Sequence, residues 1–249
     1  MALYAVAFIA SLLPSIGLFL WLRGFEEDDE FKGICNRDLI QGILTVFPVL
    51  GCSFVFAIIE SSLSRLFGIS GIPKAAFHDF IVVALSEELS KCYMFHRMLD
   101  KYQRAWSWAD YVILTTLVHI GFGLAEDFPY AIGAGPIVML VRGVTCQHGG
   151  YGFIMGYFLG KGKKSGNKKW TILGVLLPWL IHGSYDFGLS EEFSALGDNT
   201  AFLSVTLAGL GIVILLVLIV FFIRHKHDEN FMAPMVPLPE PELEPDAEA

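Results

Sequence analysis

The chain has 249 residues, of which 54% are hydrophobic and only 17% are charged, whereas a typical soluble domain has roughly 25% charged residues. This composition excludes a disordered protein and a nucleic-acid-binding protein, disfavours a soluble enzyme, and predicts an integral membrane protein. The formal net charge of −8 arises largely from two acidic runs, one within residues 26–38 and one within residues 228–248, so the remainder of the chain is nearly neutral.

Seven segments are long and apolar enough to cross a membrane as helices. A spanning helix needs about 20 apolar residues, because the hydrocarbon core is ~30 Å thick and each residue rises ~1.5 Å. A helix also satisfies its own backbone hydrogen bonds in lipid. The expected spans are residues 2–22, 39–59, 75–95, 109–126, 136–160, 170–187 and 200–223. We therefore expect an all-α polytopic membrane protein with about seven transmembrane helices.

Lysine and arginine residues lie mostly on one side of these spans. If the N-terminus is outside, thirteen of the 17 basic residues fall in inner segments, and only Arg65 and Lys74 fall in outer ones. The positive-inside rule therefore predicts an N-out, C-in topology in the cell membrane. We expect residues 1–227 to form the membrane domain, and residues 228–249, rich in proline and glutamate, to be a disordered cytoplasmic tail.

Ionisable residues inside a span are costly, so each is a functional candidate. Glu87 and Glu88 lie near the middle of the third span, with Lys91 one turn further on. Because positions i, i+3 and i+4 share a helix face, Lys91 can reach either carboxylate. Two neighbouring buried acids cannot easily both be ionised, which suits one of them to take a proton from water. We favour Glu87 as this base and Glu88 as its support through Lys91.

The fourth span adds a second carboxylate position. Phe122 and Glu126 are four residues apart, and His119 and Glu126 are seven apart, so all three lie on one stripe of the helix. We expect Glu126 to face the site, and we interpret His119 as a structural residue without a direct role. Asp127 follows at the expected outer boundary.

The fifth and sixth spans contribute imidazoles. His148 lies midway along the fifth span and is followed by glycines, which leave room for another backbone; we interpret Arg142 as a partner for nearby carboxylates. His182 and Asp186 in the sixth span are four residues apart, so Asp186 either orients His182 or shares a cavity with it. Glu87 and His148 lie at similar depths, which predicts one polar cavity among helices 3–6 that opens outward.

This set of residues suggests chemistry on an activated water molecule. Glu87 or Glu88 would take the proton of the water, and His148 or Glu126 would hold it. His182 and Asp186 would stabilise the oxyanion or orient the substrate.

Zinc is the alternative to a water molecule activated by glutamate alone. Two histidines and a carboxylate can bind Zn²⁺ and leave one position open for water, which here would use His148, His182 and Glu126 as ligands. The helical HExxH pattern is absent from the sequence, so the metal-free mechanism is favoured on these grounds.

Four motifs in order on four consecutive spans resemble the PrsW family of bacterial intramembrane proteases. They cover residues 75–187 and comprise EExxK from Glu87 to Lys91, FxxxE from Phe122 to Glu126, His148 with Gly152, and HxxxD from His182 to Asp186. Each motif is weak alone, but their order makes the resemblance specific.

The resemblance implies a fold and an activity. PrsW proteins are described as metalloproteases that make the first cut in membrane-anchored anti-sigma factors, and they look like distant relatives of the CAAX prenyl endopeptidases. That superfamily also includes a non-catalytic seven-helix scaffold subunit of gamma-secretase, so a membrane scaffold remains the alternative function. A proton-coupled transporter is disfavoured because no internal repeat is found.

Overall fold

The computed structural model describes residues 2–25, 28–102, 104–133, 140, 142–143, 145–197, 213–214 and 216–235. Across these residues the chain is helical, and the one pairing of extended segments is a single bridge between Ser107 and Pro234. Four helices within this part of the chain are long and apolar enough to cross a membrane: Val6–Arg23, Asp29–Phe67, Trp108–Pro129 and Lys168–Leu189. The expected all-α polytopic architecture is confirmed, while the count of seven spans and the N-out orientation stay predictions.

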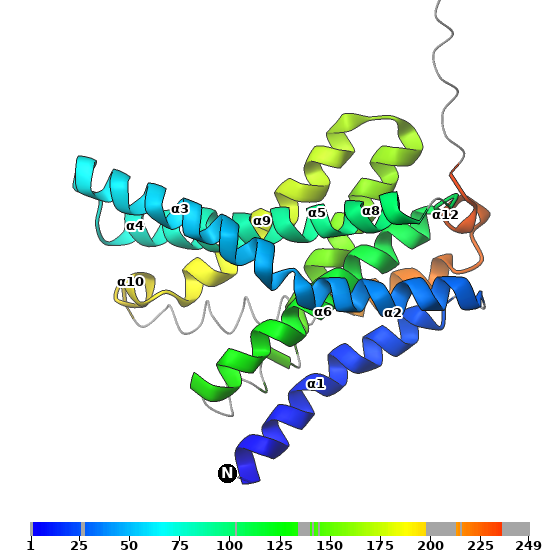
Figure 1. Ribbon diagram of the computed structural model, residues 1–249, viewed down its shortest axis with the longest axis horizontal. Helices are drawn as coiled ribbons and strands as arrows, with labels where there is room; N and C mark the ends of the chain where they lie inside the picture. Colours follow the sequence, from blue (N-terminus) through cyan, green and yellow to red (C-terminus); the bar gives the residue numbers. More distant parts are fainter. Residues whose placement is uncertain are drawn as a thin grey trace, which may run out of the picture.

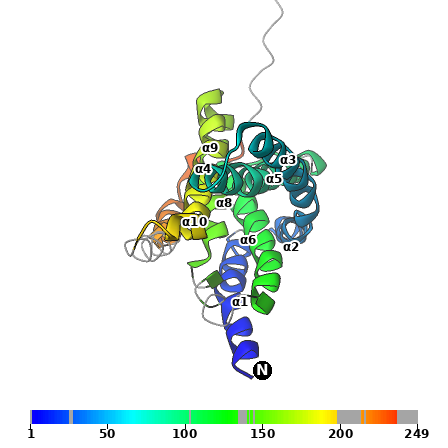
Figure 2. The ribbon, with the colours of Figure 1, turned by 90° about the vertical axis from the view of Figure 1, so that its left-hand side faces the viewer.

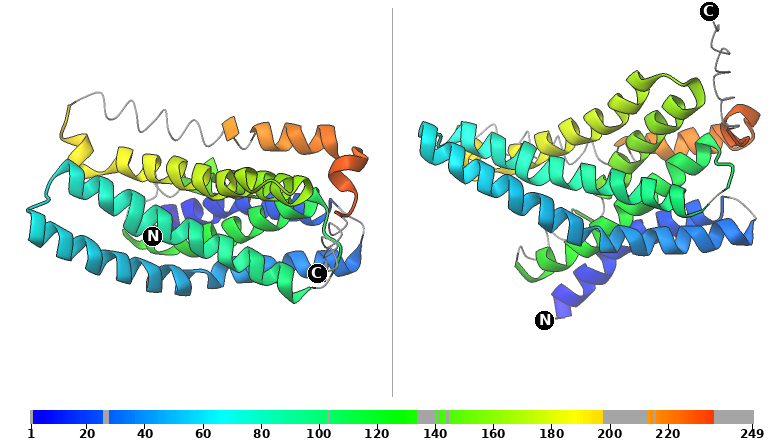
Figure 3. Two further views of the ribbon diagram at one scale, coloured as in Figure 1. Left: turned by 90° about the horizontal axis from the view of Figure 1, so that it is seen from above. Right: turned by 45° about the horizontal axis from the view of Figure 1, so that its top comes forward.

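Two long rods lie side by side at one face of the bundle (Figures 1 and 3). The first consists of α2 (Asp29–Leu44) and α3 (Val46–Phe67). The second consists of α4 (Ile72–Phe77), a π-helix η1 (His78–Leu85) and α5 (Ser86–Lys101).

The sequence explains where the first rod begins and where it bends. The side chain of Asp28 caps α2 by accepting a hydrogen bond from the Glu30 amide at 2.9 Å, and this bond lowers the pKa of Asp28. The break between α2 and α3 falls at Thr45, because Pro48 has no N–H for the carbonyl of Leu44. Most of the acidic run within residues 26–38, which lies outside the expected spans, is therefore helical.

Helix α6 (Trp108–Gly133) is the centre of the molecule. In the most apolar stretch of its span 78% of the residues are buried, against 17–33% in the other three candidate spans. It packs against α1 (Ala2–Arg23), α2 and α8 (Gln147–Ser165), which surround it in Figure 2. Helix α9 (Lys168–Leu189) packs on α8 and η1 and is followed by the short α10 (Glu191–Ser194).

Glycines let these helices approach closely. A Cβ atom on Gly152 of α8 would lie 2.7 Å from the carbonyl oxygen of Thr115 in α6, and a Cβ on Gly121 of α6 would lie 2.9 Å from the Cα of Gly42 in α2. Small residues at helix crossings are the usual means of packing helices in lipid. The crossings at Gly42 and Gly152 hold α2 and α8 directly against the backbone of α6.

The start of the predicted tail differs from the expectation. Residues 229–232 form the short helix α12 (Glu229–Met232), and Phe231 is 2% exposed, with its ring 5.6 Å from Trp108 and 5.7 Å from Phe222. This apolar anchor orders residues 228–235, which composition alone did not suggest. Residues 236–249, most of the seventh expected span and the first part of the fifth lie outside the described residues.

Candidate active site

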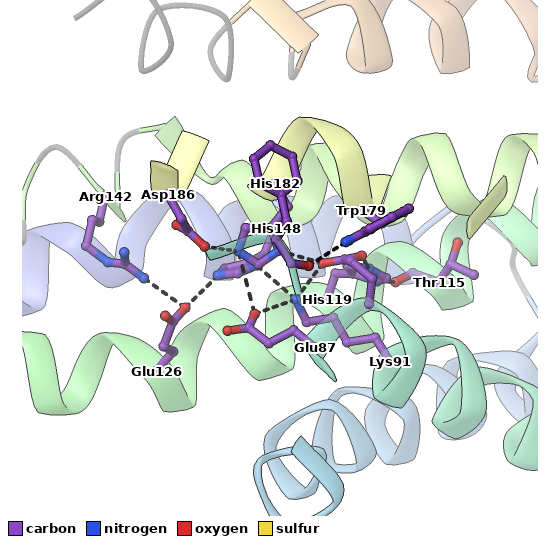
Figure 4. A network of polar contacts seen from close by, with 12 residues as sticks. Glu87, Lys91, Thr115, His119, Glu126, Arg142, His148, Trp179, His182 and Asp186 are labelled. Carbon is purple, nitrogen blue, oxygen red and sulfur yellow. Dashed lines mark hydrogen bonds and ion pairs between the residues drawn. The ribbon is translucent and has the colours of Figure 1, made fainter. Parts of the chain in front are cut away.

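The polar residues singled out in the sequence meet at one place among four helices (Figure 4). They come from the start of α5, the middle and C-terminal part of α6, residues 142–148 and the C-terminal half of α9. The group consists of Glu87, Glu88, Lys91, His119, Phe122, Glu126, Arg142, His148, His182 and Asp186. Nine of its members are joined by hydrogen bonds or ion pairs, and Phe122 contacts Lys91 through its ring.

Lys91 lies at the centre of this group and is completely buried. Its Nζ donates to Glu87 Oε2 at 2.9 Å and to Glu88 Oε1 at 2.8 Å, and it lies 3.3 Å from His148 Nδ1. An ammonium has three N–H donors, and here it has three acceptors. The ring of Phe122, with its centroid 4.3 Å from Nζ, covers the remaining side as a cation–π partner.

Glu88 is held on both of its oxygens. Oε1 accepts from His182 Nδ1 at 2.9 Å as well as from Lys91, and Oε2 lies 2.9 Å from His119 Nε2. The side chain of Glu88 has no exposed surface. A carboxylate with every direction occupied is well placed to fix its neighbours and poorly placed to receive a proton from a substrate water.

Glu87 is bound on one side only. Its Oε2 accepts from Lys91 and lies 3.8 Å from His182 Nε2. For Oε1 the described part of the chain offers no hydrogen bond. Glu87 is 5% exposed, and its Oε1 is left as an acceptor for a hydrogen bond from water.

His148 links the centre to the carboxylate of α6. Its Nε2 is 2.6 Å from Glu126 Oε2, and Arg142 Nη2 donates to the same oxygen at 2.8 Å. The Nε of Arg142 also donates to Asp127 at 3.2 Å. The turn into α8 places Cys146 at a φ of 42°, a left-handed conformation uncommon for residues other than glycine, two positions before His148.

His182 is held between two carboxylates and a ring. Its Nε2 is 3.2 Å from Asp186 Oδ2, its Nδ1 contacts Glu88, and Tyr151 stacks on it at 5.0 Å between centroids. Because both nitrogens face carboxylates, His182 donates to both only as an imidazolium.

Comparisons with known proteins identify the family of the chain. The model of the PrsW family intramembrane metalloprotease matches residues 39–224, which include all four motifs. The chain belongs to the PrsW family. It is therefore an enzyme, a protease, and an integral membrane protein.

Several relatives of this PrsW-family chain cover most of its length. A protease PrsW of Oceanobacillus iheyensis is 28% identical over 89% of this chain and 95% of the relative. Those of Shouchella clausii and Bacillus subtilis are 31% and 30% identical over 74% and 73% of this chain, and over 83% and 81% of their own lengths. No solved structure matches the chain.

The matching family is described as one of metalloproteases, which raises the question of a metal among these donors. Among the described residues, Glu87, Glu88 and His148 bring ligand atoms within 4.8 Å of one another. Within the same part of the chain the expected ligands His148, His182 and Glu126 do not form such a group, and both nitrogens of His182 face carboxylates, those of Glu88 and Asp186. The three residues that do converge are the acceptors of Lys91, and with the ammonium between them they do not fit a divalent ion.

His119, interpreted from the sequence as structural, contacts Glu88 directly. Two further residues of the PrsW-family site were missed from the sequence. Tyr151 is three residues after His148, a spacing that places it on the same helix face and could have drawn attention to it. Trp179 donates from Nε1 to the Phe80 carbonyl at 2.5 Å and ties α9 to η1, a contact that no sequence pattern predicts.

Proposed function

We propose that this intramembrane protease cleaves its substrate by general-base catalysis, with Glu87 taking a proton from the attacking water. The observation that carries the proposal is the contrast between the two glutamates: one oxygen of Glu87 has no hydrogen bond from the described residues, whereas both oxygens of Glu88 are bound. A general base must lie within hydrogen-bond reach of the proton that it takes. The ammonium of Lys91, 2.9 Å from Oε2, stabilises the ionised form of Glu87 that this step needs.

Glu87 then returns the proton to the leaving amine. When the water attacks the carbonyl carbon, negative charge develops on the former carbonyl oxygen, and a preformed donor nearby lowers the energy of this state. His182 supplies that donor from Nε2, which lies 3.8 Å from Glu87 Oε2 and exchanges its ion pair with Asp186 for the oxyanion in this step. Asp186 and Glu88 orient its ring, and Glu126 orients His148, which in turn accepts from Lys91 and helps to fix the ammonium beside Glu87.

The substrate in this proposal is a membrane-anchored protein. The resemblance to PrsW points to an anti-sigma factor or a similar regulator, cut at the first site of a cascade. A substrate segment would enter from the outer side of an N-out, C-in protein of the cell membrane. Such a segment must be extended at the cut, because a helix keeps its peptide carbonyl hydrogen-bonded.

The burial of the network also favours a second function, that of a non-catalytic membrane scaffold. Glu88, Lys91 and His119 are fully buried and paired with one another, as they would be in a network that only holds helices together. A scaffold would lose stability when any member is replaced, whereas a protease has one member whose loss affects catalysis far more than folding.

Cleavage of a reporter separates the two functions. Wild type, Glu87→Gln and Asp79→Asn, a control acid eight positions earlier in the same rod, are each co-expressed with a single-span protein of anti-sigma-factor type. We expect wild type and Asp79→Asn to cut the reporter and equally abundant Glu87→Gln to leave it intact. If none of the three proteins cuts the reporter and a partner co-purifies with wild type, the proposed protease mechanism would give way to the scaffold function.

A further inference from the structure

We propose that the ammonium of Lys91 is the resident cation of this site, and that the wild-type protein holds no divalent ion between Glu87, Glu88 and His148. The inference deepens the proposed mechanism, since it assigns to a side chain of the chain itself the charge that a metal would supply. It rests on geometry that can be tested without peptide cleavage.

The positions of the acceptors are the first argument. Nζ of Lys91 is 2.9 Å from Glu87 Oε2, 2.8 Å from Glu88 Oε1 and 3.3 Å from His148 Nδ1. Zinc would need oxygen and nitrogen ligands at about 2.0–2.2 Å. An ion bound by these three atoms would lie almost where Nζ lies, so the two cations exclude each other by contact as well as by charge.

The enclosure of Lys91 is the second argument. Its side chain has no exposed surface, and Phe122 lies against Nζ at 4.3 Å. Because Lys91 is on the same helix as both glutamates, at i+4 and i+3, its ammonium is always at hand, whereas a free ion has to be captured from solution. For an ion to bind, the ammonium would have to leave both carboxylates and its place over the aromatic ring.

The surroundings of His148 indicate that the ammonium of Lys91 is what keeps a divalent ion out of this site. The hydrogen bond from Nε2 to Glu126 at 2.6 Å leaves Nδ1 as the acceptor, and a metal-bound histidine typically has such a carboxylate on its other nitrogen. The imidazole of His148 and the carboxylates of Glu87 and Glu88 are therefore arranged as the ligands of a divalent ion could be. Removing the ammonium should uncover a divalent-ion site that the wild type does not have.

Cobalt binding tests this directly. Wild type, Lys91→Ala, Lys91→Ala/His148→Ala and a control, Lys161→Ala, are purified in detergent and titrated with Co²⁺. Bound metal is measured by elemental analysis and by visible absorption. We expect one equivalent in Lys91→Ala, and none in the other three. Co²⁺ should raise the thermal unfolding midpoint of Lys91→Ala and leave that of wild type unchanged.

Three results would overturn the proposal. One is a stoichiometric ion in wild type that is lost in His148→Ala, because the ammonium would then not exclude it. Another is failure of Lys91→Ala to bind the ion, because the three acceptors would then not form a cation site. The third is equal binding by Lys91→Ala and its double variant. If Lys91→Ala folds only with Co²⁺ present, purification with the ion still gives its stoichiometry. None of these outcomes depends on reporter cleavage, so the ammonium proposal and the protease mechanism can fail separately.

Discussion

Glu88 of α5 and His119 of α6 face each other at 2.9 Å between Oε2 and Nε2, and both are fully buried. The other nitrogen of His119, Nδ1, is 2.7 Å from the carbonyl oxygen of Thr115, which can only accept. Nδ1 therefore carries a proton, and a proton must also lie between Nε2 and Glu88. This contact fixes the orientation of Glu88, and through Lys91 and His182 it positions the rest of the site.

Replacing His119 by alanine should lower both stability and turnover. The variant leaves Glu88 Oε2 buried without a partner, which costs about 1–3 kcal/mol. We expect kcat to fall more than KM rises, because His119 positions the site without touching substrate. Unfolding in detergent and reporter kinetics measure the two effects. Thr116→Val, whose hydroxyl donates only to the Val112 carbonyl, serves as the control; similar kinetics for both variants would contradict the positioning role.

The two glutamates should respond differently to the same substitution. Glu87→Gln is expected to lower the cleavage rate by about 10²–10⁴-fold, as for loss of a general base. Its stability should change by no more than about 1 kcal/mol, since the amide oxygen can still accept from Lys91. Glu88→Gln places an amide among three donors and breaks a buried ion pair, which should cost about 3–5 kcal/mol. Thermal unfolding of both variants in one detergent makes the comparison. Equal destabilisation would remove the division of roles proposed for Glu87 and Glu88.

Helical periodicity in the sequence was enough to predict which residues of each motif share a helix face, but not which residues of different helices are in contact. Helical spacing places Lys91 near both glutamates, as observed. The contact between His119 and Glu88 joins two helices, and one sequence cannot show which helices touch. The expected zinc ligands His148, His182 and Glu126 stay a prediction, and helical spacing could not show that each nitrogen of His182 faces a carboxylate from α5 or α9.

Two local effects that hydropathy does not detect limited the accuracy of the predicted helix boundaries. The part of the first rod before residue 39 is too polar to count as a span, so the helix was expected from residue 39, although the Asp28 cap starts it at Asp29. The third span was treated as an α-helix throughout, whereas residues 78–85 are a π-helix with wider turns that ends just before Glu87. Faces assigned at a period of 3.6 residues do not hold across such a segment.

Gly152 should not tolerate a side chain. A Cβ atom there would lie 2.7 Å from the Thr115 carbonyl oxygen and 2.9 Å from the Cβ of His119. Gly152→Ala should therefore push α8 away from α6 and destabilise the protein by about 1–3 kcal/mol. Cleavage should also fall, because His148 moves with α8. Gly51→Ala is the matched control, since nothing lies within 4 Å of its added Cβ, and its unfolding midpoint should equal or exceed that of wild type. If both alanine variants unfold at the same temperature, close packing at Gly152 is not what holds α8.

The hydrogen bond from Trp179 to the π-helix should matter for catalysis more than for stability. Trp179 Nε1 donates to the Phe80 carbonyl at 2.5 Å, and Glu87 follows the π-helix by only two residues. Trp179→Phe keeps most of the ring but removes the donor, which should cost about 1 kcal/mol. The cleavage rate should fall several-fold, because Glu87 loses its fixed place relative to His182 on α9. Trp170→Phe is the control on the same helix, since its ring stacks on Phe158 at 5.7 Å far from the site. A Trp179→Phe variant that cuts the reporter at the wild-type rate would show that η1 holds Glu87 in place without this bond.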